Sequence, residues 1–463
     1  MKPILLIDFG STYTKLTAVD VEEERILGTA QSFTTIQTDV GDGLNNGLKL
    51  LEEKVGKLDY VETYACSSAA GGLRMVTSGL VPELTSEAAK LASLGAGAKV
   101  VGLYSFQLTE DDLEEIVALK PDIFLLCGGT DGGNTECILH NARMLATLPP
   151  KFPIIIAGNR TAARECARIL SEHPVHICPN VLPKFGTLNI DPTQQKIRDI
   201  FLERIIQAKG LSKAAELLDD IMMPTPSAVL QAMELLSKGT ENEPGIGDLV
   251  AVDVGGATTD VYSMADGMPE SMNTVYKGIP EPFSKRTVEG DIGMRYSIRG
   301  IVEAVGIRRI ATLSGLTEQR VDELVTYLSE HTDLVPDGNA EMTALDYALA
   351  SAAVETAVAR HAGTMEETYT LMGLTYVQSG KNLTHVKKII VTGGSLIHTE
   401  NTDKIARHAQ YSPAQPMSLR PKAADVWVDR SYILAAMGLL SGHYPDAALR
   451  IMKKELEKHG YSQ

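Results

Sequence analysis

The sequence predicts an α/β protein made of two homologous halves, with a smaller parallel α/β module inserted in the first. Three observations lead to this prediction. An apolar strand that ends in Asp-x-Gly and small residues occurs twice, at Asp8 and at Asp253. Short apolar runs alternate with helical patterns over residues 83–182, which is typical of a parallel sheet. The 463 residues include 40 glycines but only eight phenylalanines and one tryptophan, which favours tight strand-to-helix turns around an aliphatic core.

The first half begins with a predicted β-meander. Residues 3–8 are apolar, and two further strand-like runs follow at 15–19 and 25–31. An apolar stripe with helical spacing then predicts a helix over 43–55, and 60–65 is typical of a strand.

The inserted module alternates strands and helices. Its predicted strands are 100–104, 123–127, 153–157 and 176–178, and its predicted helices are 110–119, 135–146 and 161–171. Strand–helix units of this length predict a small parallel sheet.

The rest of the chain shows a helical region and then the second half. Residues 192–240 are mostly helical in pattern, with a break at Pro224-Thr225-Pro226, and 238–248 reads as an exposed connection. The second half is predicted to contain a strand at 249–253, an alanine-rich helix at 344–361, a strand at 388–392 and a C-terminal helix at 444–459. We therefore expect a first lobe from residues 1–82 and 183–245, the module at 83–182, and a second lobe at 246–463.

Charge and cysteine content exclude several classes of protein. The formal net charge is −16, and no basic run exceeds two residues, so nucleic acid is not expected as a principal ligand. The five cysteines form no C-x-x-C pair, which argues against a disulfide framework. The first apolar run ends at Asp8, and no stretch approaches the ~20 apolar residues of a membrane span. We expect a reduced, cytoplasmic protein that does not bind membranes.

The turns that follow Asp8 and Asp253 are the candidate sites for binding Mg²⁺ and phosphate. A strand that delivers an aspartate into a turn of small residues can hold a hydrated Mg²⁺, while backbone N–H groups approach phosphate oxygens. One such turn alone also fits a plain hairpin. Two of them facing each other would clamp a polyphosphate, and a third turn at Gly393-Gly394-Ser395 suits the close approach of a nucleoside.

These three segments resemble the nucleotide motifs of the actin/Hsp70/sugar-kinase superfamily. They are Asp8-Phe9-Gly10-Ser11-Thr12-Tyr13-Thr14-Lys15 for phosphate 1, Asp253-Val254-Gly255-Gly256-Ala257-Thr258-Thr259-Asp260 for phosphate 2, and Val391-Thr392-Gly393-Gly394-Ser395 for adenosine. The resemblance implies two ribonuclease-H-like halves around an ATP–Mg²⁺ cleft. It assigns Mg²⁺ binding and catalysis to Asp8 and Asp253, with Asp260 as a helper, and nucleotide contacts to the other small and hydroxyl residues of the motifs and to Lys15.

A narrower resemblance covers nearly the whole chain. The matching segments are Ser67–Met75, Gly128–Gly133, Ala157–Arg160 and Lys285–Arg295, and they resemble the MutL/GlmL family associated with glutamate mutase. The family implies an ATP-dependent reactivating, chaperone-like factor for an adenosylcobalamin-dependent mutase. Such a factor would release damaged cobalamin through ATP-driven motion of the cleft, and its partner would be a mutase subunit. The particular mutase and the formation of a homo-oligomer stay open.

Several alternatives remain at this point. A small-molecule kinase of the same fold needs a catalytic base that the sequence does not identify, and a non-catalytic actin-like scaffold would only bind the nucleotide. Lys15 fits either a phosphate contact or a solvent-exposed strand position. Cys66 has no partnered base nearby in the sequence, so a strand end is favoured over a nucleophile. No Asp-x-His-x-x-Gly occurs, so we expect no base-off cobalamin binding.

Overall fold

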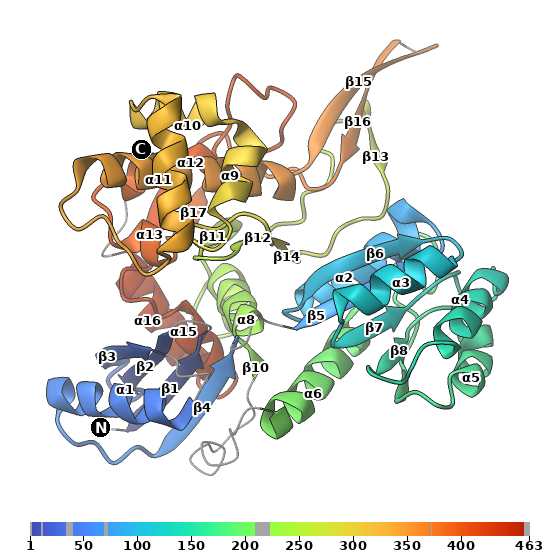
Figure 1. Cartoon of the computed structure of the whole chain (residues 1–463), viewed down its shortest axis with the longest axis horizontal. Helices are drawn as coiled ribbons and strands as arrows, with labels where there is room; N and C mark the ends of the chain where they lie inside the picture. The colour runs from blue at the N-terminus through green and yellow to red at the C-terminus, as the bar shows by residue number, and fades with distance from the viewer. Residues whose placement is uncertain are drawn as a thin grey trace. The chain divides into compact units, whose positions relative to one another are not determined.

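The computed structural model describes residues 2–10, 13–33, 40–68, 73–208, 223–371 and 373–457 (Figure 1). Contacts divide the chain into two compact units. Unit 1 comprises Met1–Ala232, Gly278–Pro280 and Leu434–Ile451, and unit 2 comprises Met233–Lys277, Glu281–Ile433 and Met452–Gln463. The expected three-part division stays a prediction, because these contacts leave the inserted residues with the first unit. No helix of the described residues is long and apolar enough to cross a bilayer.

The first sheet of unit 1 contains the predicted meander. In order of hydrogen bonding its strands are β10 (Met223–Pro224), β4 (Glu62–Ser67), β1 (Pro3–Phe9), β2 (Tyr13–Asp20) and β3 (Arg25–Phe33). β1, β2 and β3 are antiparallel neighbours, while β4 runs parallel to β1. β1 is buried along its whole length, since α1 (Val40–Val55) packs on this sheet through β2 and β3, and α15 (Leu434–Ser441) contacts β1 and β4.

The second sheet of unit 1 is parallel throughout, as predicted. Its strands, in order, are β6 (Lys99–Ser105), β5 (Arg74–Gly79), β7 (Ile123–Leu126), β8 (Ile154–Ile156) and β9 (Val175–Ile177). Its helical segments are η1 (Pro82–Ser86), α2 (Glu87–Gly95), α3 (Glu110–Leu119), α4 (Glu136–Ala146) and α5 (Arg160–Ile169). β5 precedes residue 83, so the sheet starts earlier in the chain than the alternation of patterns suggested. α6 (Asp191–Ala208) packs against α2.

α8 (Thr225–Lys238) connects the two units along the chain. The predicted break at Pro224-Thr225-Pro226 is where β10 ends and α8 begins, and the unit boundary falls between Ala232 and Met233, inside this helix. α8 lies close against α15, because a Cβ atom on Gly438 would come within 1.8 Å of the Ala228 carbonyl oxygen.

The main sheet of unit 2 repeats the first sheet of unit 1. Its strands, in order, are β18 (Asp425–Val428), β17 (Lys388–Thr392), β11 (Leu249–Val254), β12 (Thr259–Met264) and β14 (Ser284–Glu289). β11, β12 and β14 are antiparallel, while β17 and β18 run parallel to β11. The predicted pair of ribonuclease-H-like halves is therefore confirmed as a fold, since both sheets have the same order and the same strand directions.

Helices cover the sheet of unit 2. They are α9 (Ile298–Val305), α10 (Ile307–Ser314), α11 (Glu318–Glu330), α12 (Ala340–His361), α13 (Gly394–Ile397), α14 (Thr402–Ala406) and η2 (Arg407–Ala409). The C-terminal helix α16 (Pro445–Glu457) belongs to unit 1 up to Ile451 and to unit 2 from Met452. α12 is the predicted alanine-rich helix, and its small side chains let it pack on β11 and β12 while α9, α10 and α11 pack on α12.

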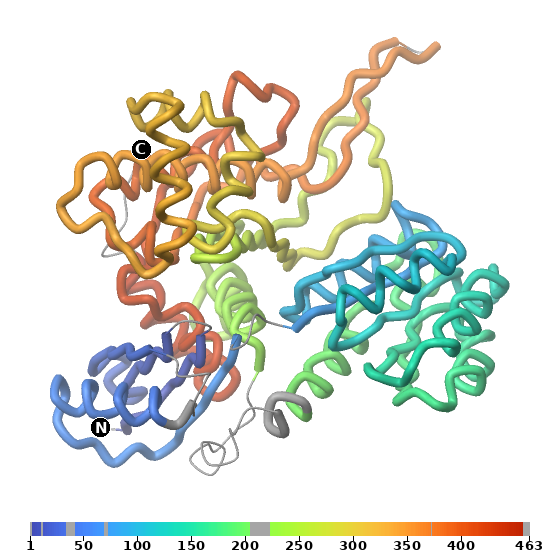
Figure 2. The backbone as a smooth tube through the Cα atoms, viewed as in Figure 1, coloured from blue at the N-terminus to red at the C-terminus, as the bar shows by residue number. Residues whose placement is uncertain are grey.

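A smaller sheet of unit 2 was not anticipated from the sequence. It consists of β13 (Thr274–Lys277), β16 (Gly373–Ser379) and β15 (Thr364–Thr370), in that order. The backbone trace shows the β15–β16 hairpin extending away from the helices of unit 2 (Figure 2). We call this three-stranded sheet the arm.

Candidate functional site

The first candidate turn joins β1 to β2 in unit 1. Asp8 lies opposite Lys15 in the ladder, and the Gly10 N–H donates to the Tyr13 carbonyl oxygen at 3.0 Å. A Cβ atom on Gly10 would lie 2.5 Å from that oxygen, so the turn closes only around glycine. The predicted ligands Ser11 and Thr12 lie outside the described residues.

Asp8 is held by donors on both carboxylate oxygens. The Thr225 hydroxyl, at the start of α8, donates to Oδ1 at 2.6 Å, and the Cys66 thiol donates to the same oxygen at 3.5 Å. The Lys15 ammonium lies 3.6 Å from Oδ2. Asp8 is 5% exposed, so these contacts fix its orientation at the end of β1. Lys15 therefore lies at the candidate site and does not extend freely into solvent.

Cys66 is a hydrogen-bond donor at this site and not a nucleophile. The residue is fully buried on β4, directly beside Asp8 in the parallel ladder. Burial, followed by the negative charge of Asp8, raises the pKa of the Cys66 thiol well above its usual range. Because the thiolate is the reactive form of cysteine, this thiol is inert at neutral pH.

The second candidate turn joins β11 to β12 in unit 2 and has the same construction. The Gly255 N–H donates to the Thr258 carbonyl oxygen at 2.9 Å, as Gly10 does to Tyr13. Asp253 lies opposite Asp260 in the ladder, in the position that Lys15 takes opposite Asp8. The two hairpins thus match in register, but the residue facing the aspartate has the opposite charge.

Asp260 forms a buried ion pair. Its Oδ1 accepts from Arg286 on β14, at 2.8 Å from Nε and 2.6 Å from Nη2. Burial and then the charge of Asp260 raise the pKa of the neighbouring Tyr262 well above its usual range, so the phenol stays protonated. Asp260 therefore ties β14 to β12, and its predicted helper role in catalysis stays a prediction.

The third candidate turn lies against the second. Gly393 has φ 100°, and a Cβ atom there would lie 2.3 Å from the Val254 carbonyl oxygen and 2.9 Å from Oδ1 of Asp253. The Ser395 hydroxyl donates to the same Val254 carbonyl oxygen at 3.3 Å. At Gly394 a Cβ atom would meet nothing within 4 Å, which leaves open space above the turn. Unit 2 thus brings its two predicted motifs together at Asp253.

A loop that the motif search did not single out as part of the site supports the second turn. The N–H groups of Arg295 and Tyr296 both donate to the Gly256 carbonyl oxygen at 2.9 Å. Arg295 is anchored in turn by Asp346 on α12 through two hydrogen bonds of 3.0 and 2.7 Å. A bidentate pair of this kind fixes both position and angle, so the loop holds the exposed Gly256 and Ala257 in place.

The remaining predicted ligands fall into two groups. Thr14 and Thr259 occupy equivalent positions and are completely buried, and the Thr259 hydroxyl donates to the Ile292 carbonyl oxygen at 3.0 Å. Their predicted contacts with the nucleotide stay a prediction. Tyr13 packs against Phe33 with ring centroids 4.7 Å apart, and Thr258 stays half-buried beside Asp260.

Sequence reasoning did not assign Thr225, Arg286 and Arg295 to the site, although Arg286 and Arg295 stand in the family segment Lys285–Arg295. Each acts through a contact with a residue that is distant in the sequence or on a neighbouring strand. The Pro-Thr-Pro segment around Thr225 predicted a break in the helical region, but it did not predict the contact of Thr225 with Asp8.

The geometry also limits how a metal is held. Among the described residues, no group of three or more His, Cys, Asp or Glu side chains is placed to bind a metal. A Mg²⁺ at Asp8 or Asp253 fits only as an ion that keeps waters and phosphate oxygens as its other ligands, which is how Mg²⁺ is commonly bound beside nucleotides.

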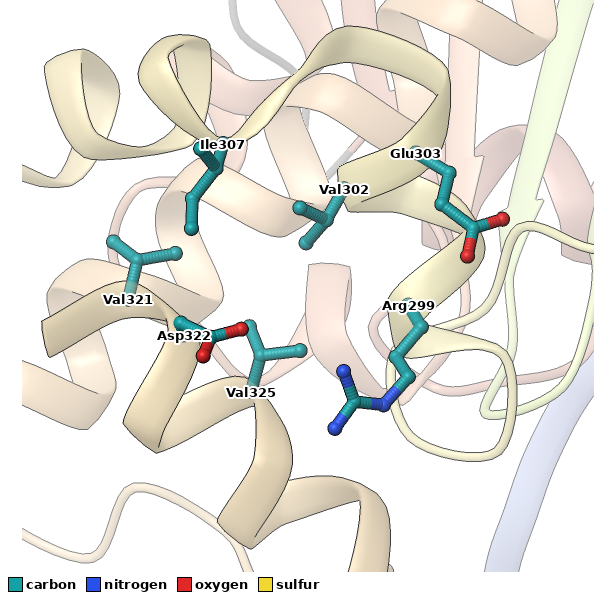
Figure 3. A pocket seen from close by; sticks show the side chains of 7 residues that line it. All are labelled: Arg299, Val302, Glu303, Ile307, Val321, Asp322 and Val325. Carbon is teal, nitrogen blue, oxygen red and sulfur yellow. The ribbon is translucent and has the colours of Figure 1, made fainter. Parts of the chain in front are cut away.

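A hollow between α9, α10 and α11 is a separate feature (Figure 3). Its volume is about 80 Å³, and the residues that line it are Arg299, Val302, Glu303, Ile307, Val321, Asp322 and Val325. Ligand pockets usually measure about 300–1,000 Å³, so this hollow is too small for a nucleotide.

Comparisons with known proteins agree with the motifs. A family model described as MutL protein matches residues 4–456. Protein MutL of Clostridium tetanomorphum is 48% identical over 462 residues, which is 99% of this chain and 100% of that protein. Among solved structures, gluconate kinase from Lactobacillus acidophilus is 10% identical with a TM-score of 0.38, covering 100% of this chain and 92% of that one. The activator of 2-hydroxyisocaproyl-CoA dehydratase from Clostridium difficile with bound ADPNP is 10% identical with a TM-score of 0.32, covering 98% and 97%.

Proposed function

Since this chain belongs to the MutL protein family, we propose that it is an ATP-dependent accessory protein that reactivates an adenosylcobalamin-dependent mutase of the glutamate mutase or aminomutase type. The observation that carries the proposal is the repeated hairpin. Asp8 and Asp253 end equivalent strands of two sheets with the same order, and each precedes a turn closed by the same glycine hydrogen bond. A duplicated turn of small residues, each with an aspartate that can order a Mg²⁺, suits a nucleoside triphosphate, because backbone N–H groups and the metal ion both favour the negative phosphates.

The residues of each half would have distinct roles. Asp8 and Asp253 would each help to order a hydrated Mg²⁺ beside the phosphates, and the bound ion would neutralise charge on the transferred phosphoryl group. Thr225 keeps the Asp8 carboxylate in one orientation. Lys15, at 3.6 Å from Asp8, can place its positive charge beside a phosphate oxygen. Gly393 lets the turn pack closely against Asp253 and Val254, and Gly394 leaves room above it for the nucleoside.

An accessory role gives this ATPase a physical purpose. Radical enzymes that lose their adenosyl group retain a dead cobalamin in a tight complex, and its release requires that complex to be opened. A protein whose two halves change their separation on binding ATP can supply the necessary difference in affinity between two states of the partner.

The aspartates provide the test. Asp8→Ala and Asp253→Ala should each reduce Mg·ATP hydrolysis to background, because the loss of one ion-ordering carboxylate removes several kcal/mol of transition-state stabilisation. Asp425→Ala is the matched control, since Asp425 also belongs to a strand of the unit 2 sheet but pairs with Lys388 near the surface. Hydrolysis should proceed without an added acceptor, which separates an ATPase from a small-molecule kinase. Wild-type rates in both variants would remove these residues from the mechanism.

A further inference from the structure

The arm exposes large apolar side chains that no part of the described chain covers. Tyr369 is 81% exposed, and Leu371, beside it at the tip, is fully exposed. Leu374 on β16 and Val275 on β13 are also exposed. Exposed apolar groups that are scattered singly need no explanation, whereas their concentration on a small projecting sheet marks an interaction surface.

The register shows that one face of the arm is aromatic. Tyr369 lies directly opposite Leu374, and Glu367 lies directly opposite Tyr376. Directly opposed residues share a face, and residues two apart on one strand share it too. Tyr369, Leu374 and Tyr376 therefore form a continuous patch, with Glu367 at its border. Tyrosine is enriched at the centres of protein interfaces because its ring buries a large area at low entropic cost.

The base of the arm is fixed, although its tip is exposed. The amide of Gln378, which is fully buried, donates to the carbonyl oxygens of Gly267 at 2.7 Å and Gly380 at 2.8 Å. The Met365 N–H donates to the Met417 carbonyl oxygen at 2.9 Å. A surface presented on a firm base loses less conformational entropy when it binds.

The charges on β15 indicate what occupies this surface. β15 is an edge strand of the arm, and both Glu366 and Glu367 are exposed on it. Edge-to-edge pairing with a second copy would bring four carboxylates onto one short ladder, where like charges repel. The acidic border instead suits a different protein whose apolar groove is bordered by Lys or Arg.

We propose that the arm is the element by which this protein holds its enzyme partner, with Tyr369, Leu371 and Leu374 entering an apolar groove that has a basic border. The inference rests on the proposed function in one respect, namely that the partner is the mutase. It goes further in assigning recognition to a surface of unit 2 that contains none of the nucleotide motifs.

The experiment measures binding of the full-length chain to purified adenosylcobalamin-dependent glutamate mutase. The triple variant Tyr369→Ser, Leu371→Ser and Leu374→Ser should weaken binding about tenfold or more, as expected for the loss of interface anchors, with basal ATPase activity unchanged. The variant Glu367→Lys, at the border of the patch, should also weaken binding, and its loss should be greatest at low ionic strength. The matched control, Phe185→Ser with Val335→Ser, removes exposed apolar groups elsewhere and should bind as the wild type does.

Three other outcomes would each contradict the inference. If the wild type binds the mutase and the triple variant binds equally well, recognition lies elsewhere, while the proposed function stands. If the wild type does not bind the mutase at all, both the inference and the proposed function fail. If sedimentation shows that the wild type is an oligomer and the triple variant is not, the occupant is a second copy and the inference is overturned.

Discussion

At the scale of single residues, Asp8 shows how the candidate site is built from distant parts of the chain. Thr225 lies 217 residues away in the sequence, yet its hydroxyl donates to the Asp8 carboxylate at 2.6 Å. A break in the helical region was predicted at Pro224-Thr225-Pro226, but no local pattern indicates which strand end Thr225 will meet. Asp8 could be predicted from its motif. Its contact with Thr225 could be found only from the three-dimensional structure.

Thr225→Val tests this positioning role. A hydrogen bond to a charged group contributes about 1.5–3 kcal/mol, so ATP turnover should fall on the order of ten- to a hundredfold. Thr225→Ser keeps the hydroxyl and should retain most of the activity. Steady-state ATPase rates, with circular dichroism as a folding check, provide the measurement. Equal rates in the valine and serine variants would show that the contact does not matter for turnover.

Gly393 and Gly394 form a matched pair of neighbouring glycines. Gly393→Ala places a Cβ atom against the Val254 carbonyl oxygen at a positive φ, which should destabilise unit 2 by about 1–3 kcal/mol. Gly394→Ala meets no atom within 4 Å and should cost little. Trp427, the single tryptophan of the sequence, is buried on β18 in unit 2, so its fluorescence during urea unfolding reports on this unit. Equal midpoints for the two variants would contradict the tight turn.

At the scale of elements, local patterns located many helices and strands but not their partners. α3 and β17 have the predicted bounds, because their apolar spacing and flanking polar residues are local signals. β5 was missed as a strand of the parallel sheet, since its six residues are mixed in character and its neighbours β6 and β7 come later in the chain. The arm was missed because β15 is mostly polar and exposed, so it lacks the apolar alternation of a core strand.

A buried cationic cluster lies at the base of the arm, in contact with β12 and β14. Lys381 is 1% exposed, and its ammonium group donates to the Phe283 carbonyl oxygen at 2.6 Å and to the Ser263 hydroxyl at 3.4 Å. His361 is hydrogen-bonded to the same hydroxyl at 2.8 Å, and the Lys285 ammonium donates to the His361 carbonyl oxygen. The cluster places two lysines in one desolvated region.

Burial and then the charge of Lys285 lower the pKa of Lys381 to about 7, against the opposing influence of carboxylates. These carboxylates are Glu281, Asp266 and Asp248. Burial also lowers the pKa of His361 well below its usual range, so that ring is neutral. Between pH 7 and about 10.5, Lys381 is therefore protonated in the unfolded state and has lost its proton in the folded state.

The stability of unit 2 should accordingly rise with pH across this interval, because the unfolded state binds more protons there. Below pH 7 Lys381 is protonated in both the folded and the unfolded state, so this gain in the stability of unit 2 is absent. Lys381→Met should raise the free energy of unfolding at pH 7 relative to the wild type and should flatten its rise towards pH 10. Urea unfolding followed by Trp427 fluorescence at several pH values measures both effects. A slope that is the same in the wild type and in the variant would mean that Lys381 titrates normally.

At the scale of the whole molecule, the two halves share a sheet and differ in what is added to it. In the first half the parallel module lies between β4 and β10, and in the second half the arm is built from segments before β14 and before β17. The two similar halves could be predicted because the Asp-x-Gly motif occurs twice in the sequence, at Asp8 and at Asp253. The additions were less predictable, since each joins segments that are far apart in the chain.

The module is attached to the first half next to Asp8. Ser227, two residues after Thr225, donates to the Ala96 carbonyl oxygen at 2.9 Å, and a Cβ atom on Gly97 would lie 2.7 Å from the Ser227 hydroxyl oxygen. The first turn of α8 therefore contacts both the candidate site and the end of α2.

The central claim is tested most directly by the ATPase rate of the full chain with and without glutamate mutase that carries an inactive cobalamin. The account predicts basal hydrolysis that the inactivated mutase stimulates, and recovery of mutase activity only when ATP and adenosylcobalamin are both present. The Asp8→Ala variant should show neither stimulation nor recovery. Recovery that proceeds equally without ATP, or an ATPase rate that is indifferent to the mutase, would contradict the account.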